Sequence, residues 1–255
     1  MRREIDEALQ SWPYDPDSGD VVARQIKARD GRTVLQIRVE LGLLQLEVEA
    51  RPDGTRPHSF ATYLDYLRHR ARSRASSASK TGEPWSMSAE HCAEADREFA
   101  QFYHRRVAWM SLQRYDRALL DADHSLALMD FVRKHATDAD YVASHERFRG
   151  LVLFHRTQAA AALALERDKP DEAVDVIRQG MDRLAEHQQA WASDAGREDT
   201  PNEALIEQLR ALEREIRKTF AVEKTLREQL DEAVAEEDYE RAARLRDQIK
   251  SRAGR

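Results

Sequence analysis

The chain has 255 residues, of which 35% are charged, 41% hydrophobic and 7% aromatic, with a formal net charge of −6. This composition is typical of long exposed helices around modest cores, and the acidic balance argues against a nucleic-acid grip over the whole surface. The single cysteine, Cys92, excludes an internal disulfide and a cysteine-cluster metal site. No apolar run approaches the roughly 20 residues of a membrane span. Because Met1-Arg2-Arg3 leads into acidic residues rather than a signal peptide, we expect a cytoplasmic protein.

A strand pattern lies within residues 20–51. The odd positions from Leu35 to Leu41 are apolar, and after Gly42 the apolar set moves to the even positions from 44 to 50. A two-residue turn at Gly42-Leu43 brings both sets to one face of a sheet, by pairing 41 with 44, 39 with 46 and 37 with 48.

A second turn signal, Asp30-Gly31, lies upstream of these strands. It pairs 26 with 35 and 22 with 39, again on the same face. The two turns together predict a three-stranded antiparallel meander. A glycine-centred bulge at residue 42, within one long strand, is the alternative.

A meander with one apolar face requires a cover. Ser59 is a candidate cap for a helix in which Phe60, Tyr63, Leu64 and Leu67 follow at helical spacing. A short helix from about residue 3 to 12 can precede the strands. Residues 1–70 are therefore predicted to form a small α+β domain.

Two polar breaks divide the rest of the chain. The basic, Ser-rich stretch from Arg68 to Lys80, with Gly82 and Pro84 behind it, predicts a linker over residues 71–87. The run from Ser193 to Gly196, with Pro201 after it, marks a second linker over residues 193–202. Residues 88–192, between the two breaks, are helical by composition.

The middle segment contains a weak internal repeat. Residues 107–128 carry Ala108, Trp109 and Leu112 on a first helix, and the run from Tyr115 to Ala118 opens a second. This resembles the tetratricopeptide (TPR) pattern. A second copy lies at residues 160–184, where residues 170–173 take the place of the run from Tyr115 to Ala118. The copies lie further apart than the ~34 residues of an ordinary repeat. Either the second helix of the first pair runs on, or an extra turn lies near residues 134–140, in a TPR-like helical bundle.

A heptad pattern follows from residue 205 to residue 233, with apolar residues alternately four and three positions apart. Thr219 and Glu223 interrupt it, and Glu213 and Arg217 form a favourable i,i+4 pair. The stripe can pack on a second helix of the same chain, on the helical bundle or on a partner. A coiled-coil dimer through residues 205–233 is one possible self-association.

The end of the chain separates its charges, because the charged residues of 223–240 are mostly acidic and those of 241–255 mostly basic. If the basic segment folds antiparallel onto the acidic segment, the opposite charges come close together. Asp238 is then the cap of the second helix. This predicts a helical hairpin of residues 226–236 against 239–250. Its inward stripe is Tyr239, Ala242, Leu245 and Ile249.

The run from Leu226 to Lys250 resembles the UVR motif, the interaction hairpin of the bacterial excision-repair subunits UvrB and UvrC. Similar copies occur in Clp-type chaperones and in activators of bacterial protein-arginine kinases. The motif's aromatic-Glu-x-Ala-Ala-x-Leu-Arg-Asp core corresponds to residues 239–247, with Tyr239 in place of the usual Phe. The resemblance implies a contact with another UVR hairpin or a partner subunit, rather than a reaction. The implied partner-binding residues are Leu226, Leu230, Ala233, Tyr239, Glu240, Ala242, Ala243, Leu245, Arg246, Asp247 and Ile249.

Signals for catalysis are missing from the sequence. No G-x-x-x-x-G-K-[ST] phosphate loop occurs. His145-Glu146 begins like a zinc-protease motif, but Arg149 stands where the second histidine is required. The zinc-binding cysteine pairs of the kinase activators are also absent, since Cys92 is alone. We expect no enzymatic activity, no cofactor and no metal site.

The sequence as a whole predicts a mainly α protein with a small α+β N-terminal part, a TPR-like bundle and a C-terminal coiled-coil or UVR hairpin over residues 203–255. We interpret it as a bacterial, non-catalytic adaptor whose partner is a repair subunit, a Clp-type chaperone or a kinase regulator. The alternative is a nucleic-acid-associated factor of DNA excision repair that uses the basic segment 68–80. Its phosphate-binding residues would be Arg68, Arg70, Arg72, Arg74 and Lys80. The same residues are also compatible with a cationic helix end that runs into a solvated linker.

Overall fold

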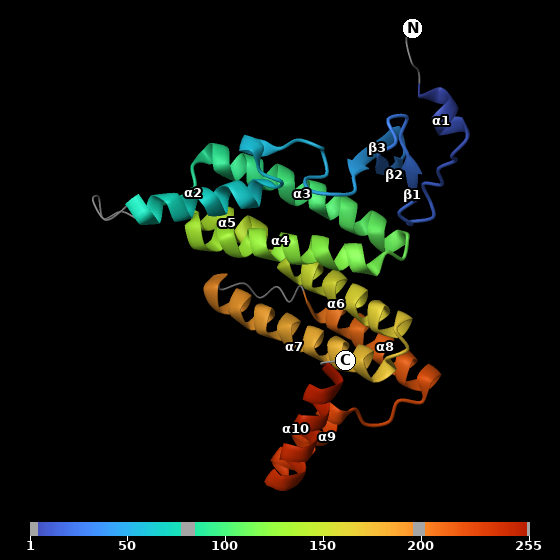
Figure 1. Cartoon of the computed structure of the whole chain (residues 1–255), viewed down its shortest axis with the longest axis vertical. Helices are drawn as coiled ribbons and strands as arrows, with labels where there is room; N and C mark the ends of the chain where they lie inside the picture. Colours follow the sequence, from blue (N-terminus) through green and yellow to red (C-terminus); the bar gives the residue numbers. More distant parts are fainter. Residues whose placement is uncertain (1–4, 78–84, 196–201, 254–255) are drawn as a thin grey trace. The chain divides into compact units, whose positions relative to one another are not determined.

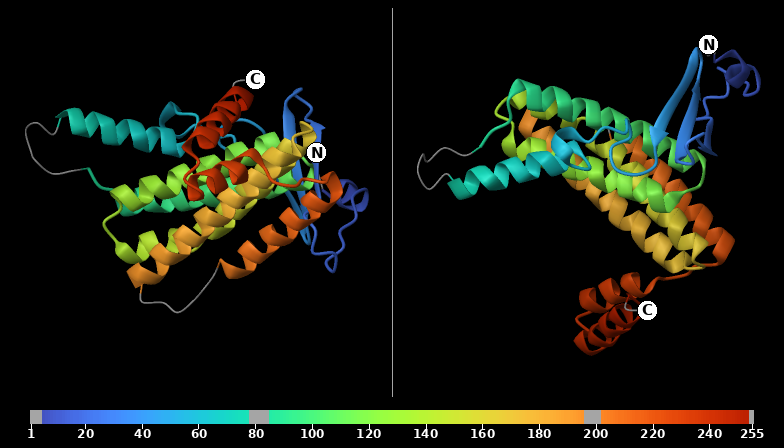
Figure 2. Two further views of the ribbon diagram at one scale, coloured as in Figure 1. Left: turned by 90° about the horizontal axis from the view of Figure 1, so that it is seen from below. Right: turned by 45° about the horizontal axis from the view of Figure 1, so that its top comes forward.

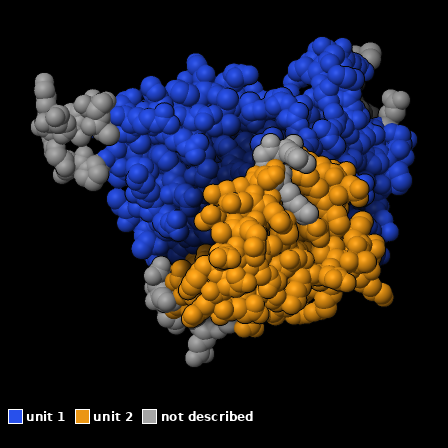
Figure 3. Space-filling model, turned by 60° about the horizontal axis from the view of Figure 1, so that its bottom comes forward, with its two compact units in different colours: residues 1–152 blue, residues 153–255 orange. Residues whose placement is uncertain are grey.

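The structure is a computed structural model that describes residues 5–77, 85–195 and 202–253 (Figure 1). The chain divides into two compact units, residues 1–152 and 153–255, which Figure 3 colours separately. The elements, in chain order, are α1 (Asp6–Gln10), β1 (Ala23–Lys27), β2 (Thr33–Val39), β3 (Gly42–Glu47), the 3-10 turn η1 (Pro57–Ser59), α2 (Tyr63–Ser77), α3 (Ala89–Ser111), α4 (Tyr115–His135), α5 (Ala139–Glu146), α6 (Arg149–Glu166), α7 (Pro170–Ala195), α8 (Glu203–Phe220), α9 (Leu226–Ala235) and α10 (Tyr239–Ala253). This order confirms a mainly α fold with a small α+β part at the N-terminus and a helical pair at the C-terminus.

The three strands form the predicted antiparallel meander, in the order β1-β2-β3. The central strand β2 is buried on both faces, since Val34 and Leu35 are both fully buried. A glycine bulge within one long strand is therefore not what the chain adopts, because β2 and β3 are two separate strands.

The predicted register of β2 with β3 is wrong by four residues. Leu35 pairs with Leu46 and Val39 pairs with Gly42, so the turn consists of Glu40 and Leu41 rather than Gly42-Leu43. Leu41 is 90% exposed at the tip. An even shift leaves every side chain on its predicted face, which is why the alternation alone could not distinguish the two registers.

The side chain of Arg38 stabilises the observed turn. Its guanidinium donates hydrogen bonds to the carbonyls of Val39, Glu40 and Gly42, which closes the turn around one cation. Turn carbonyls that would otherwise depend on water are satisfied in this way. The sequence pattern carries no sign of this contact.

The register of β1 with β2 differs from the prediction by one residue. Gln25, not Ile26, pairs with Leu35, because the loop has three residues. Ala28 N–H donates to the Arg32 carbonyl, and Gly31 has φ +84°, the left-handed conformation that a three-residue hairpin loop requires. The odd shift moves Ile26 to the face opposite the predicted one.

The helix that covers this region begins later than predicted. Thr62, rather than Ser59, caps α2: its hydroxyl accepts a hydrogen bond from the Asp65 N–H at 3.2 Å. The carboxylate of Glu98 in α3 accepts from the backbone N–H groups of Tyr63 at 2.5 Å and Leu64 at 3.0 Å. A buried acid therefore satisfies the free N–H groups and faces the positive end of the helix dipole.

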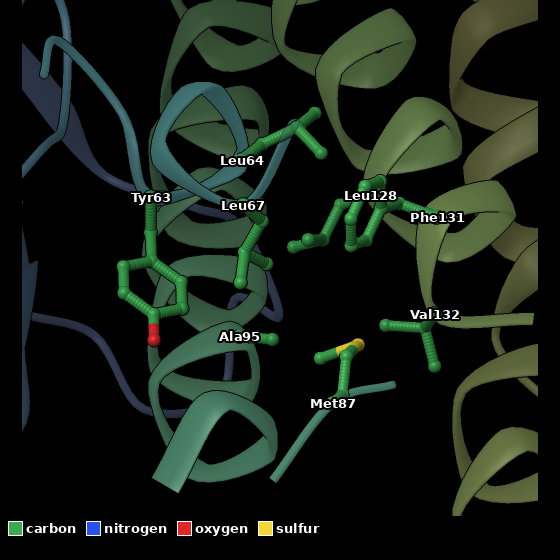
Figure 4. Close-up of a cluster of buried hydrophobic side chains, with 8 residues drawn as sticks. All are labelled: Tyr63, Leu64, Leu67, Met87, Ala95, Leu128, Phe131 and Val132. Carbon is green, nitrogen blue, oxygen red and sulfur yellow. The ribbon is translucent and has the colours of Figure 1, made fainter. Parts of the chain in front are cut away.

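The core of the N-terminal unit lies where α2 packs on α3 and α4 (Figure 4). Apolar side chains from α2 and α4 meet there, together with Met87 from the segment before α3. The eight buried residues drawn in the figure are Tyr63, Leu64, Leu67, Met87, Ala95, Leu128, Phe131 and Val132.

Buried charges in this unit are paired. Arg105 of α3 forms two hydrogen bonds with Asp121 of α4, at 2.9 and 2.7 Å, and also donates to the carbonyls of Glu47 and Ala50. Arg106 donates to the Ser125 hydroxyl at 2.9 Å. Burial lowers the pKa of Arg106 to about 10. Arg105 thus ties the helical pair to the strand region through polar contacts that the sequence did not reveal.

The helix boundaries in the middle segment agree with the positions of the predicted repeat. Tyr115 opens α4 four residues after α3 ends at Ser111, and Pro170 opens α7 after α6 ends at Glu166. Leu112, expected on the first helix, is the C-cap residue of α3 instead. Of the two options for the long spacing, the chain has the extra turn, because α4 ends at His135 and α5 begins at Ala139. The TPR resemblance itself stays a prediction.

Two expected boundaries differ from the structure. Helix α2 continues to Ser77, well into the stretch expected to be a linker from residue 71, and residues 78–84 lie outside the described residues. The predicted heptad run from 205 to 233 is two helices, because α8 ends at Phe220 and Ala221 adopts a left-handed φ of +50°. The polar residues Thr219 and Glu223 mark this break.

The face of α8 that the heptad pattern singled out packs within the chain. Leu209 and Ile216 are buried, and α8 packs on α7. A continuous coiled coil through residues 205–233 is therefore not available for self-association. In the described part of the chain, no helix has both the length and the apolar character needed to cross a membrane.

Candidate functional site

The predicted C-terminal hairpin is present as two short helices, α9 and α10. They lie side by side in both views of Figure 2, where they are red. Thr225 begins the hairpin with a capping box: its hydroxyl accepts from the Glu228 N–H at 3.3 Å, and the Glu228 carboxylate accepts from the Thr225 N–H at 2.7 Å. The start of α9 is therefore fixed by residues of its own first turn.

The turn between the arms is a Schellman motif. Asp238 N–H donates to the Ala233 carbonyl at 2.8 Å and Glu237 N–H donates to the Val234 carbonyl at 3.1 Å. Glu237 occupies the left-handed position, with φ +58°, where glycine is usual. Asp238 caps α10 as predicted, since its carboxylate accepts from the Arg241 N–H at 2.9 Å.

Five of the eleven predicted partner-binding residues build the hairpin's own core. Ala233, Ala242 and Leu245 are buried, with Leu226 and Leu230 packed against them. Alanine at two of these positions lets the helix backbones approach closely. These five side chains support the shape of the hairpin; Ala233, Ala242 and Leu245 are buried, whereas Leu226 and Leu230 are half-buried.

The other predicted residues lie towards the outside. Tyr239 is 69% exposed, so its predicted inward position is wrong. It is the first residue of α10, next to the turn, where α9 has already ended and offers no surface to cover the ring. Exposed or half-buried positions are also found for Glu240, Ala243, Arg246, Asp247 and Ile249. Val234, which the prediction omitted, is 52% exposed.

Charge pairing contributes less to the hairpin than its sequence indicated. Glu236 and Arg241 approach to 3.5 Å across the turn, and Lys224, just before α9, lies 2.7 Å from Glu232 within it. Both pairs are exposed, and exposed pairs add little stability. The apolar contacts and the caps therefore hold the arms together.

The base of the hairpin is clamped to α7 and α8 by four charged side chains, which we call the Glu228 clamp. Glu228 accepts from Arg178 at 2.8 Å and from Arg217 at 2.9 Å, and the same two arginines bind Glu213 at 2.8 and 2.9 Å. Burial raises the pKa of Glu228, but hydrogen bonds from the Thr225 N–H and Arg217 outweigh it, so the net pKa lies below the ordinary value.

A further hydrogen bond reinforces this clamp. The Thr225 hydroxyl, which is buried, donates to the Asp175 carboxylate of α7 at 2.6 Å. Burial raises the pKa of Asp175, and the hydrogen bond from Thr225 opposes that shift. A polar cleft of about 510 Å³ between α7, α8 and α9 surrounds these contacts. Sequence reasoning found the Glu213–Arg217 pair, but no sequence signal links Arg178 or Asp175 to α9.

The predicted basic segment lies on α2. Arg68 is half-buried, while Arg70, Arg72 and Arg74 are exposed; Lys80 lies outside the described residues. Among the described residues, no three histidine, cysteine, aspartate or glutamate side chains come together to hold a metal ion. Burial raises the pKa of the Cys92 thiol, so the thiolate that a nucleophile needs is disfavoured.

Comparison with protein families assigns this hairpin. Residues 224–251 match the UvrB/uvrC motif, UVR, from the residue before the Thr225 cap to near the end of α10. This confirms the resemblance at the C-terminus and covers that part of the chain alone. Comparison with curated proteins and with solved structures gave no match.

Proposed function

We propose that the protein is a non-catalytic adaptor that binds a protein partner through its UVR hairpin. The observation that carries the proposal is that residues 224–251 match the UVR motif and fold as a closed helical pair with its own small core. In the UVR proteins that this hairpin resembles, the motif binds another UVR hairpin or a partner subunit.

The outer surface of the hairpin supports a docking role. Val234 and Tyr239 are exposed apolar or aromatic side chains on either side of the turn, at 52% and 69% exposure. Tyrosine is enriched at the energetic centres of protein interfaces. The Glu228 clamp holds the other end of α9, so the turn is the end that is free to meet a partner.

A partner with its own UVR hairpin is the form of the proposal that we favour, namely a repair subunit, a Clp-type chaperone or a kinase regulator. A role in excision repair requires such a repair partner or a nucleic-acid contact elsewhere in the chain.

Binding of purified bacterial UvrB, UvrC and other UVR-hairpin proteins to the full chain tests the proposal. Replacing Tyr239 and Val234 together with Ser removes the exposed side chains but leaves the hairpin core intact, and we expect affinity to fall about tenfold or more. Leu41→Ser, at an equally apolar and more exposed site in the N-terminal unit, is the matched control and leaves affinity unchanged.

Leu245→Ala alone does not test docking, because it removes part of the hairpin's own core and can lower affinity by unfolding the hairpin. It is therefore measured beside the Tyr239/Val234 variant. Amide hydrogen exchange of α9 and α10 checks that the hairpin remains folded in the Tyr239/Val234 variant. If no UVR-hairpin protein binds the full chain, or if the Tyr239/Val234 variant binds as tightly as the original chain, the proposal is wrong.

A further inference from the structure

The arginines of α2 differ from most of the arginines in the described part of the chain. Arg32, Arg51, Arg105 and Arg149 each pair with a carboxylate. The four on α2 form no ion pair with a described residue. These four are Arg68, Arg70, Arg72 and Arg74. A helix with four cations that pair with no described residue, on a chain of net charge −6, is a local positive field that an anionic ligand can use.

A groove runs beside these cations. It lies between α2 and α4, has a volume of about 410 Å³, and combines Arg68, Arg72 and Lys134 with an apolar floor that includes Phe131. Its acidic residue, Asp130, is occupied by Arg133 at 3.1 Å and Arg149 at 2.9 Å. The groove therefore presents positive charge without an available counter-ion from the described residues that line it.

Aromatic rings continue from the basic helix onto the segment before it. His58 stacks on Tyr66 with ring centroids 3.9 Å apart, and Phe60 lies 5.2 Å from His69. Both histidines are exposed. Their ring partners, Tyr66 and Phe60, are half-buried.

The backbone that holds His58 is strained. His58 and Ser59 both have left-handed φ values, +51° and +71°, which non-glycine residues rarely adopt. Two hydrogen bonds hold this conformation, from Ser59 N–H to the Arg56 carbonyl and from Phe60 N–H to the Pro57 carbonyl. Strain of this kind concentrates at binding sites, and here it presents a flat exposed ring next to arginines that pair with no described residue.

We propose that α2 and residues 58–60 form a binding surface for single-stranded nucleic acid. Arginines neutralise the phosphates and exposed rings stack on the bases, a combination that binds single strands with little sequence preference. A duplex keeps its bases stacked on one another, so the rings would contribute nothing to it. An acidic peptide would use the arginines but has no flat bases to stack. This surface belongs to the N-terminal unit and is independent of the docking function proposed for the UVR hairpin.

The test measures binding of the full chain to a fluorescent oligo(dT) of about 12 nucleotides by anisotropy, over a range of salt concentrations. Replacing Arg70, Arg72 and Arg74 with Ala removes three exposed cations from a helix that tolerates alanine well. We expect affinity to fall about tenfold or more and the salt slope to shrink by about 2, at about 0.7 per phosphate contact. The charge-matched control replaces Lys218, Arg244 and Lys250 with Ala, and leaves both quantities unchanged.

His58→Gly separates binding from stability. Glycine relieves the left-handed strain, so the variant should unfold at the same or a higher urea concentration, whereas the loss of the stacking ring should weaken oligo(dT) binding about fivefold or more. A residue with a purely structural role would not weaken binding while preserving the fold. The Tyr239/Val234 variant binds oligo(dT) normally, so failure here and failure of the docking proposal are distinguishable.

Three results would overturn the nucleic-acid proposal. The first is equal oligo(dT) affinity of the variant that lacks the three α2 arginines and of its charge-matched control. The second is a duplex of the same length that binds as tightly as the single strand, together with no effect of His58→Gly. The third is poly-glutamate that competes as well as oligo(dT) at equal charge, which would assign the surface to an acidic protein partner.

Discussion

The core beneath α2 and the core of the UVR hairpin differ in the size and polarity of their buried side chains. Beneath α2, large side chains such as Leu64, Leu67 and Phe131 are buried together, and a buried carboxylate, Glu98, is bound from several directions. The hairpin core consists of Ala233, Ala242 and Leu245, with two partly buried leucines. Hydrophobic stabilisation grows with apolar area removed from water, so the first core supports its own fold and the second supports little.

This difference explains why the hairpin needs the Glu228 clamp. Two short helices are marginal without tertiary packing. The contacts of Thr225 and Glu228 with α7 and α8 supply part of what the small core lacks. An element held in this way can stay folded while its outer surface is left free for a partner.

The largest effect is expected from Glu98→Ala. The substitution leaves the N–H groups of Tyr63 and Leu64 without their acceptor and removes one of the carboxylates around the buried Arg51. Breaking a buried charge network in this way costs about 3–5 kcal/mol, measured by urea unfolding. Glu94→Ala removes a carboxylate that also pairs with Arg51 but is partly exposed, and should cost about 1 kcal/mol or less. Equal losses for the two variants would contradict the assignment of Glu98 as the buried cap of α2.

Leu245→Ala should have the next largest effect, and a local one. Removing this buried leucine costs about 2–3 kcal/mol, which is a large fraction of what so small a core can supply. We expect amide hydrogen exchange protection to be lost in α9 and α10 but kept in α3 and α4. Val234→Ala, at an exposed position of the same hairpin, is the control and should change little. Loss of protection in both units would show that the hairpin is not a separately stabilised element.

Acid should weaken the Glu228 clamp. The pKa of Glu228 is lowered in the fold, so its contribution is complete above the ordinary value of 4.5 and is lost as the pH falls through the folded-state pKa. The pKa of Asp175 is raised, which gives the opposite sign: its contribution is complete below the ordinary value and is lost as the pH rises through the folded-state pKa.

An Asp175→Asn background therefore isolates the Glu228 titration. In that background, Glu228→Gln should cost about 1 kcal/mol at neutral pH and should flatten the acid-side loss of α9 protection in hydrogen exchange. A Glu228→Gln variant that titrates like its parent would assign the acid sensitivity to another group.

The smallest effect, and a stabilising one, is expected from Glu237→Gly. Glu237 has φ +58° in the turn of the hairpin, and glycine adopts this conformation without the steric cost that a side chain carries. A gain of about 0.5 kcal/mol in the hairpin, seen as slower exchange in α10, is the expected outcome. Glu236→Gly, at a position whose φ is −82°, is the matched control and should destabilise slightly.

Local signals predicted the hairpin well, because its caps and turn are made by neighbours in sequence. Asp238 caps α10 as its sequence context indicated, and the alanines at the contact face could be recognised from their spacing. Tyr239 was misplaced because a helical spacing states which face a residue shares, but not whether the opposite helix extends far enough to cover it.

In the sheet, by contrast, the sequence pattern predicted the strands but not their register. Alternation in residues 35–50 indicated two strands and one turn, but a shift of four residues leaves the alternation intact. Arg38 stabilises the turn that forms, since it donates to three carbonyls around Glu40 and Leu41. In the same way, Ser59 and Thr62 are both good caps by residue type, and the carboxylate of Glu98 determines where α2 begins.

By itself the sequence determined the kinds of elements, their approximate order and the UVR hairpin, because periodicity, capping residues and a compact motif act over a few neighbouring positions. Only the tertiary structure decided the strand registers, the split of the heptad stripe into two helices, and the clamp of Arg178 and Arg217 on Glu228. These depend on contacts between residues far apart in the chain. The local sequence around a charged side chain does not identify the distant residue with which it will pair when water is excluded.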